Sequence, residues 1–142
     1  MRASLITGLS GPHLTPDEAR FLADVRPCGL ILFARNCETP DQVRRLISEA
    51  KEAIGEYDIL VLIDQEGGRV RRLMPPTWRD LPPAAAYARL AEADFEHAEA
   101  TARLVARLIA ADLRDLGINT NCVPVLDIPA PGSHEIIGDR AY

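Results

Sequence analysis

An unbroken apolar run, Ile59 to Ile63, leads directly into Asp64, Gln65 and Glu66, and two glycines and three arginines follow within the next six residues. A continuous run of leucine and β-branched residues is typical of a strand buried on both faces, as in a parallel sheet covered by helices. Only the carboxyl end of such a strand meets water, and the ligand sites of parallel α/β folds lie at that end. The stretch therefore predicts a buried parallel strand with a functional site at its end.

Strand and helix signals alternate along the rest of the chain. Threonine, proline and an acidic or amide residue in succession predict helix starts at Thr15-Pro16 and Thr39-Pro40, the first with a capping box closed by Glu18. Apolar residues at helical spacing predict a third helix that ends at a glycine. The expected strands are 4–7, 29–33, 59–63 and 118–126, and the expected helices are 16–25, 40–54 and 94–116.

This alternation predicts four β/α units in series and a parallel sheet with right-handed crossovers. The sheet could be an open doubly wound one or part of a (β/α)8 barrel. A complete barrel typically needs about 250 residues, so the 142 residues here would form only about its first half. The proline-dense stretch 74–83 is expected to be an exposed loop.

Composition limits the class of protein. The net charge of −5 argues against a nucleic-acid partner. The chain has no apolar run of the length that crosses a membrane, and the apolar stretch near Met1 is too short for a secretory signal, so none is expected. Three cysteines at no metal-ligand spacing, Cys28, Cys37 and Cys122, indicate reduced thiols and a cytoplasmic protein.

Polar residues follow the other strands too. Arg35 and Asn36 come after the second expected strand, and Asp127 follows the fourth. Arg35 and Asn36 could support a site or cap a loop, while Asp127 is expected mainly as a structural hydrogen-bond acceptor. Arg69 and Arg71 could serve the site or be ordinary surface charge.

Four stretches together resemble the N-terminal domain of family 3 glycoside hydrolases, most closely the bacterial cytosolic β-N-acetylhexosaminidases that act on cell-wall fragments. They are Gly29-Leu30-Ile31-Leu32-Phe33-Ala34-Arg35-Asn36, Ile63-Asp64-Gln65-Glu66-Gly67-Gly68-Arg69-Val70-Arg71-Arg72, Pro124-Val125-Leu126-Asp127 and Ile137-Gly138-Asp139-Arg140-Ala141-Tyr142. They occur in the family's order and cover nearly the whole chain. Residues 1–142 would then be the N-terminal part of a (β/α)8, TIM-type barrel domain.

The resemblance implies a retaining glycosidase, without metal or cofactor, that removes terminal N-acetyl-β-glucosaminyl residues from muropeptide fragments. It also implies substrate-binding roles. Asp64 would grip the hydroxyls of the terminal sugar, Arg72 would assist it, and Arg140 would be a second arginine at the sugar. Glu66 is interpreted as an organiser behind these residues.

In this family the nucleophilic aspartate and the acid/base loop follow the Arg-Ala-Tyr segment, so this chain is expected to lack both and to be inactive alone. The expected partners are a small carbohydrate and either the missing C-terminal half of the barrel or a second copy joined through the open sheet edge. Two other classes stay open. One is a small metal-assisted α/β enzyme that uses Asp64 and Glu66, with Asp127 as a further ligand; the other is a non-catalytic sugar-binding or assembly module.

Overall fold

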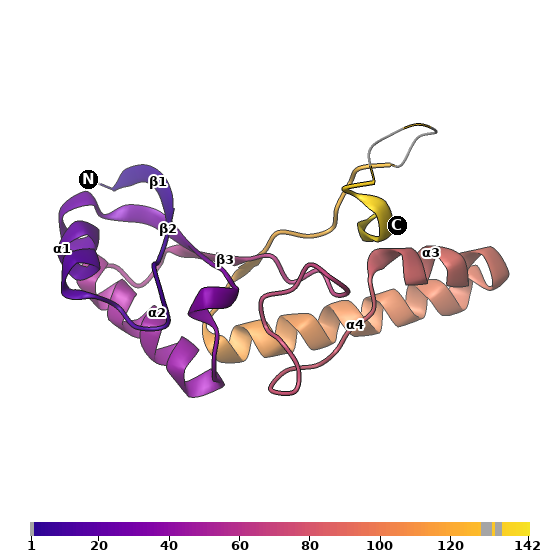
Figure 1. The fold of residues 1–142 in the computed structure, drawn as a ribbon, viewed down its shortest axis with the longest axis horizontal. Helices are drawn as coiled ribbons and strands as arrows, with labels where there is room; N and C mark the ends of the chain where they lie inside the picture. Colours follow the sequence, from indigo (N-terminus) through magenta and orange to yellow (C-terminus); the bar gives the residue numbers. More distant parts are fainter. Residues whose placement is uncertain (1, 129–131, 133–134) are drawn as a thin grey trace.

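The computed structural model describes residues 2–128, 132 and 135–142, and its centre is a parallel sheet of consecutive strands (Figure 1). The strands are β1 Ala3–Gly8, β2 Pro27–Leu32, β3 Leu60–Ile63 and β4 Thr120–Asn121, in the spatial order β1-β2-β3-β4. Each strand pairs in parallel with the next one. The predicted α/β class and the predicted parallel sheet are confirmed.

The first two helices begin where their capping residues predict. Helix α1, Pro16–Val25, has Thr15 as its N-cap and a complete capping box with Glu18. Helix α2, Pro40–Ile54, begins at Thr39, whose hydroxyl accepts a hydrogen bond from the main-chain N–H of Gln42. Local side-chain chemistry therefore sets both helix starts.

Helices cover one face of the sheet only. Leu22 of α1, Leu46 of α2 and Leu116 of the helix before β4 pack with alternate strand residues in one core. On the opposite face Leu60 is 45% exposed, whereas its neighbour Val61 is fully buried. The expectation of strands buried on both faces is therefore wrong for the described part of this chain, because the side chains that alternate with the core residues have no layer over them.

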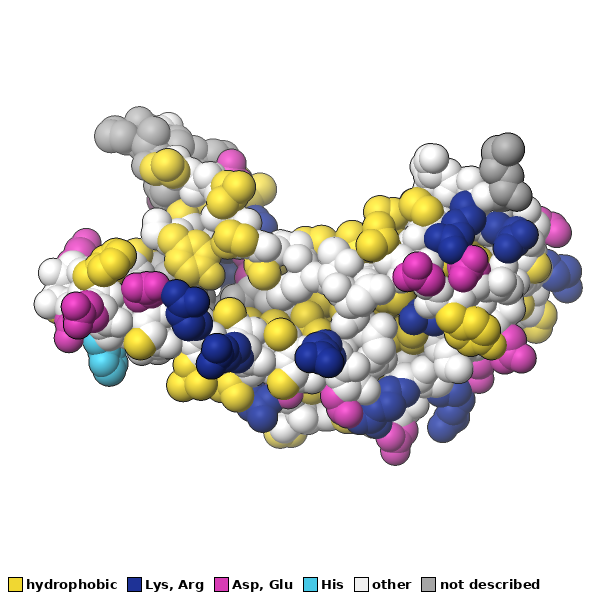
Figure 2. All heavy atoms as spheres, turned by 180° about the vertical axis from the view of Figure 1, so that it is seen from behind, with side chains coloured by type: hydrophobic (Ala, Val, Ile, Leu, Met, Phe, Trp, Pro, Cys, Tyr) yellow, Lys and Arg dark blue, Asp and Glu magenta, His cyan; other side chains and the backbone are white. Residues whose placement is uncertain are grey.

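Two helices connect β3 to β4. Helix α3, Ala84–Ala93, was not predicted; it follows the proline-dense loop and is rich in alanine, the strongest helix former. Helix α4, Phe95–Leu116, was predicted and is capped by Asp94 and Gly117. It runs well beyond the sheet, and α3 folds back along its outer part (Figure 1). The molecule is consequently elongated, and the face seen in Figure 2 is hollowed between its two ends, with hydrophobic side chains in the hollow.

The fourth strand is much shorter than expected. The prediction was 118–126, but only Thr120 and Asn121 pair with β3 as a ladder. Pro124 has no N–H to donate, which limits the strand on one side. On the other side Asn119 keeps one main-chain bond, from its N–H to the Val61 carbonyl at 3.2 Å, and its side chain adds two more: it donates to the Ile59 carbonyl and accepts from the Val61 N–H, both at 2.8 Å.

Candidate functional site

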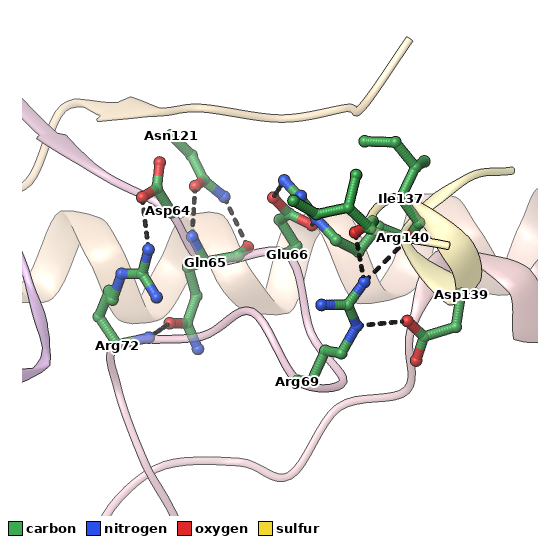
Figure 3. A network of polar contacts seen from close by, with 10 residues as sticks. Asp64, Gln65, Glu66, Arg69, Arg72, Asn121, Ile137, Asp139 and Arg140 are labelled. Carbon is green, nitrogen blue, oxygen red and sulfur yellow. Dashed lines mark hydrogen bonds and ion pairs between the residues drawn. The ribbon is translucent and has the colours of Figure 1, made fainter. Parts of the chain in front are cut away.

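An aspartate–arginine pair lies at the carboxyl end of β3. Asp64 follows the last residue of the strand, and Arg72 returns to it from the far end of the next loop (Figure 3). Nη2 of Arg72 donates to Oδ2 of Asp64 at 2.7 Å, and each side chain is 24% exposed. The pair is thus sheltered enough for strong charge-assisted hydrogen bonds and open enough to meet a small ligand.

An aromatic ring supports the arginine. The Arg72 guanidinium lies over the ring of Phe33, 5.7 Å from its centre, and that of Arg35 lies over the same ring at 4.7 Å. Both distances are within the range of a cation–π contact. Arg35 also donates to the Leu9 carbonyl at 2.9 Å. Within the described residues Nε of Arg72 is buried and has no hydrogen-bond partner, so Asp64 and the ring hold this side chain.

A second acid–base pair joins the carboxyl-terminal segment to the same loop. Nε and Nη2 of Arg140 donate to the two carboxylate oxygens of Glu66, at 2.9 and 2.7 Å. The hydrogen bonds to Glu66 raise the pKa of Arg140, and the charges of Asp127 and Asp64 raise it further. Arg140 therefore lies near Asp64 and is bonded to Glu66, the residue interpreted from the sequence as an organiser of the site.

Arg69 fastens the same segment from the other side. It pairs with Asp139 at 2.8 Å and donates to the main-chain carbonyls of Ile136 and Ile137, so it is more than surface charge (Figure 3). Beyond it Tyr142 stacks on Tyr87 of α3, with 6.1 Å between ring centres. Arg71 instead pairs with the exposed Asp80.

The remaining predicted site residues divide into a structural one and an exposed one. Asn36 is fully buried, accepts from the Phe33 N–H and donates to the carbonyls of Leu9 and Gly11. It holds two loops together, which is the capping role considered for it. Asp127 is exposed and lies well past the end of β4, so it does not sit at a strand end as predicted.

Comparison with known proteins identifies the family. The model of the glycosyl hydrolase family 3 N-terminal domain matches residues 6–142, which is almost the entire chain. The chain belongs to glycosyl hydrolase family 3. Its four parallel strands and their helices are accordingly part of a TIM-type barrel, as the sequence predicted.

Two curated relatives of this chain are both named β-hexosaminidase. A β-hexosaminidase of Methylococcus capsulatus is 42% identical over 134 residues, which are 94% of this chain and 38% of that protein. A β-hexosaminidase of Pseudomonas aeruginosa is 39% identical over 142 residues, which are 100% of this chain and 40% of that protein. The family 3 chain therefore spans about two fifths of the length of the curated relatives it matches.

Solved family 3 structures agree with this fold. NagZ from Neisseria gonorrhoeae, solved in complex with N-trifluoroacetyl-D-glucosamine, is 31% identical with a TM-score of 0.89; the match covers 98% of this chain and 41% of NagZ. A family 3 β-N-acetylglucosaminidase from Paenibacillus is 34% identical with a TM-score of 0.74, covering 88% of this chain and 23% of that protein.

Gln65 is a further residue of the site, and the sequence pattern did not single it out. It is 4% exposed, and its side chain makes three hydrogen bonds to the main chain of Arg72 and Leu73. Its two neighbours, Asp64 and Glu66, are charged and are the evident candidates for binding a ligand, whereas Gln65 is neutral. Its position directly after a buried strand was the available signal.

The family 3 site offers no cluster of metal ligands in the part of the chain that the structure describes. No group of three or more histidine, cysteine, aspartate or glutamate side chains there could hold a metal ion. The metal-assisted alternative therefore has no ligand set to rest on among these residues. In the same residues no helix is long and apolar enough to cross a membrane.

Cys122 provides a chemical reporter for Asp64. Partial burial, and then the charge and hydrogen bonding of Asp64, raise the pKa of the Cys122 thiol. Because the thiolate is the reactive form, replacing Asp64 by asparagine should lower this pKa and speed alkylation of Cys122 several-fold at about pH 8, near the ordinary thiol pKa. Mass spectrometry of iodoacetamide-treated protein measures the rate. Asp127→Asn is the control and should leave it unchanged; equal rates in Asp64→Asn and the parent would contradict the contact.

Proposed function

We propose that this chain supplies part of the sugar site of a retaining β-N-acetylhexosaminidase that removes terminal N-acetyl-β-glucosaminyl residues from cell-wall fragments. The observation that carries the proposal is the quarter-exposed Asp64–Arg72 pair at the end of β3. A carboxylate that is hydrogen-bonded to a guanidinium through one oxygen can still accept hydrogen bonds from two sugar hydroxyls. The names of the curated relatives, and the glucosamine derivative in the NagZ complex, support N-acetylglucosamine as the sugar.

Arg140 is proposed as the second arginine at the sugar, with Glu66 as its support. Glu66 uses both carboxylate oxygens on Arg140, and its side chain is only 10% exposed. Such a carboxylate is poorly placed to act as an acid, a base or a nucleophile. A retaining pair needs two carboxyl groups about 5–5.5 Å apart across the sugar; we propose that both come from residues outside 1–142.

The open sheet suggests which partner completes the site. Leu60 and Ile6 expose their side chains on the uncovered face, and an apolar groove lies beside β4, lined by Val105, Ile109 and Ala106 of α4 together with Ile118 and Val123. We propose that the remaining β/α units of a barrel cover this face, with self-association as the alternative. The three unpaired cysteines support a cytoplasmic location.

The test is a chromogenic N-acetyl-β-glucosaminide assay on two proteins. One is the 142-residue chain; the other, the completed chimaera, joins residues 1–142 to the C-terminal portion of the Methylococcus capsulatus relative that lies beyond the matched region. The chain alone should show no turnover above buffer, since general acid–base assistance alone is worth about 10² to 10⁴ in rate. The completed chimaera should turn over the substrate, and the intact relative is the positive control.

Three other outcomes would change the conclusion. Turnover by the purified 142-residue chain that disappears in Glu66→Gln would mean that the site is complete without a partner. Sugar binding without turnover in a folded chimaera would favour a non-catalytic module. A folded chimaera that neither binds nor hydrolyses the sugar would contradict the proposed function.

A further inference from the structure

We propose that Gln65 is a positioning residue that sets the Asp64–Arg72 pair, and that Asn121 holds Gln65 in place. The proposal rests on the proposed function for its consequence in sugar binding, although its geometric part stands alone. Asp64 and Gln65 are adjacent, but Figure 3 shows their side chains pointing in opposite directions. Asp64 points toward Arg72's guanidinium, whereas Gln65 points toward the main chain of Arg72.

The Gln65 side-chain amide makes the hydrogen bonds that a main-chain amide would make to a neighbouring segment. Its Oε1 accepts from the N–H groups of Arg72 and Leu73 at 2.9 and 3.0 Å, and its Nε2 donates to the Leu73 carbonyl at 3.3 Å. These three contacts fix the loop at the residue from which the Arg72 side chain reaches back to Asp64. The carboxylate and the guanidinium are thus anchored through neighbouring main-chain positions.

The anchor matters because the Arg72 side chain has few other constraints. Its buried Nε has no hydrogen-bond partner among the described residues, and its described contacts are Asp64 and the ring of Phe33. A cation–π contact fixes distance from the ring more than rotation over it. The position of the Arg72 main chain therefore decides whether its guanidinium meets Asp64 end-on.

Asn121 fixes Gln65 in turn. The Asn121 side chain accepts from the Gln65 N–H and donates to the Gln65 carbonyl, both at 2.9 Å. This is the pairing that a longer β4 would make with its main chain. The Asn119 side chain makes the same two kinds of hydrogen bond near the start of β3, to Ile59 and Val61. The edge of the sheet is thereby connected through Asn121 and Gln65 to Arg72.

A hydrophobic residue at position 65 would fill the same space but could not bind the loop. It would also leave the Arg72 and Leu73 N–H groups without their acceptor, which buried groups tolerate poorly. Glutamate would keep the acceptor for both N–H groups, and in its protonated form it could also donate to the Leu73 carbonyl in place of the amide. The conservative and the disruptive change are therefore expected to differ.

The experiment uses the uniformly ¹⁵N-labelled 142-residue chain. The Arg72 guanidinium signals are assigned from their loss in Arg72→Lys. In the parent chain its Nη protons should give separate, slowly exchanging signals because Asp64 holds them. In Gln65→Leu these signals should average, and the main-chain N–H groups of Arg72 and Leu73 should exchange with solvent about tenfold faster or more. Gln65→Glu should restore the parent behaviour.

Gln42→Leu is the matched control. Gln42 is likewise a buried glutamine bonded to main chain, at the carbonyl of Asn36 and the N–H of Glu38, but none of its hydrogen bonds among the described residues goes to Asp64, Gln65 or Arg72. This variant should lose stability and leave the Arg72 signals unchanged. If Gln65→Leu does not fold, Asn121→Ala, which keeps the glutamine, should move the same signals in the same direction.

Parent-like Arg72 signals in Gln65→Leu, or in Asn121→Ala where that variant replaces it, would overturn the proposal, as would failure of Gln65→Glu to restore them. An equal effect of Gln42→Leu would mean that general loosening is the cause. None of these measurements needs a sugar. If they succeed while Asp64→Ala leaves the affinity of the completed chimaera for N-acetylglucosamine unchanged, the positioning role stands and the proposed function fails. If the Arg72 signals stay parent-like while Asp64→Ala weakens sugar binding, the proposed function stands and the positioning role fails.

Discussion

Replacing Asp64 by alanine in the completed chimaera is expected to reduce kcat/KM for an N-acetyl-β-glucosaminide by about 10² to 10⁴. Each hydrogen bond to a charged group contributes about 1.5–3 kcal/mol, and we propose that Asp64 accepts two from the sugar. The loss of about 3–6 kcal/mol converts at 1.36 kcal/mol per tenfold. Because sugar hydroxyl contacts strengthen in the oxocarbenium-like transition state, kcat should fall as KM rises.

Asp80→Ala is the control for this prediction. Asp80 also pairs with an arginine of the same loop, Arg71, but its side chain is 69% exposed. An exposed pair contributes little, so kcat/KM should stay close to that of the parent. If Asp64→Ala and Asp80→Ala have the same kinetics, Asp64 does not bind the substrate.

Gly67→Ala is expected to destabilise the 142-residue chain by about 2–5 kcal/mol. Gly67 has φ 95°, in a region that costs an L-residue about 1–2 kcal/mol. A Cβ there would also overlap the Pro82 carbonyl oxygen, and overpacking typically adds about 1–3 kcal/mol. The loop that carries Arg72 would have to move away from the segment before α3. Urea unfolding followed by circular dichroism measures the free energy of unfolding.

Two other glycines separate the causes. Gly55 has φ 72° but no heavy atom within 4 Å of an added Cβ, so Gly55→Ala should cost only the backbone strain of about 1–2 kcal/mol. Gly11 has open space and no positive φ, so Gly11→Ala should be nearly neutral. A cost for Gly67→Ala no larger than for Gly55→Ala would contradict the predicted overlap.

The features that the sequence predicted well depend on neighbours along the chain. Capping at Thr15 and Thr39 involves residues three positions apart, and the apolar runs of β2 and β3 need only their own composition to be recognised. The position of Asp64 at the end of a strand follows from the same local pattern. These parts could be predicted because short-range sterics and hydrogen bonding decide them.

The features that the sequence could not supply depend on distant residues. Arg140 and Glu66 are 74 positions apart, and nothing in either segment indicates that Arg140 binds Glu66 instead of Asp64. At the two ends of β4, asparagine side chains accept hydrogen bonds from main-chain N–H groups that lie 58 and 56 positions away in the sequence. Burial of only one sheet face depends on which segments are present to cover the other, a property that no single strand encodes.

The strict order β1-β2-β3-β4 has a consequence for synthesis on the ribosome. Each strand pairs with the one made just before it, so the sheet can grow from the amino end without waiting for later chain. At about 5–20 residues per second, the 142 residues emerge over about 7–28 s, much longer than helices and short loops need to form. Asp64 and Arg72 emerge together, whereas Asn121, which holds Gln65, comes 56 positions after its partner and Arg140 comes 74 positions after Glu66, so the two acid–base pairs are completed in that order.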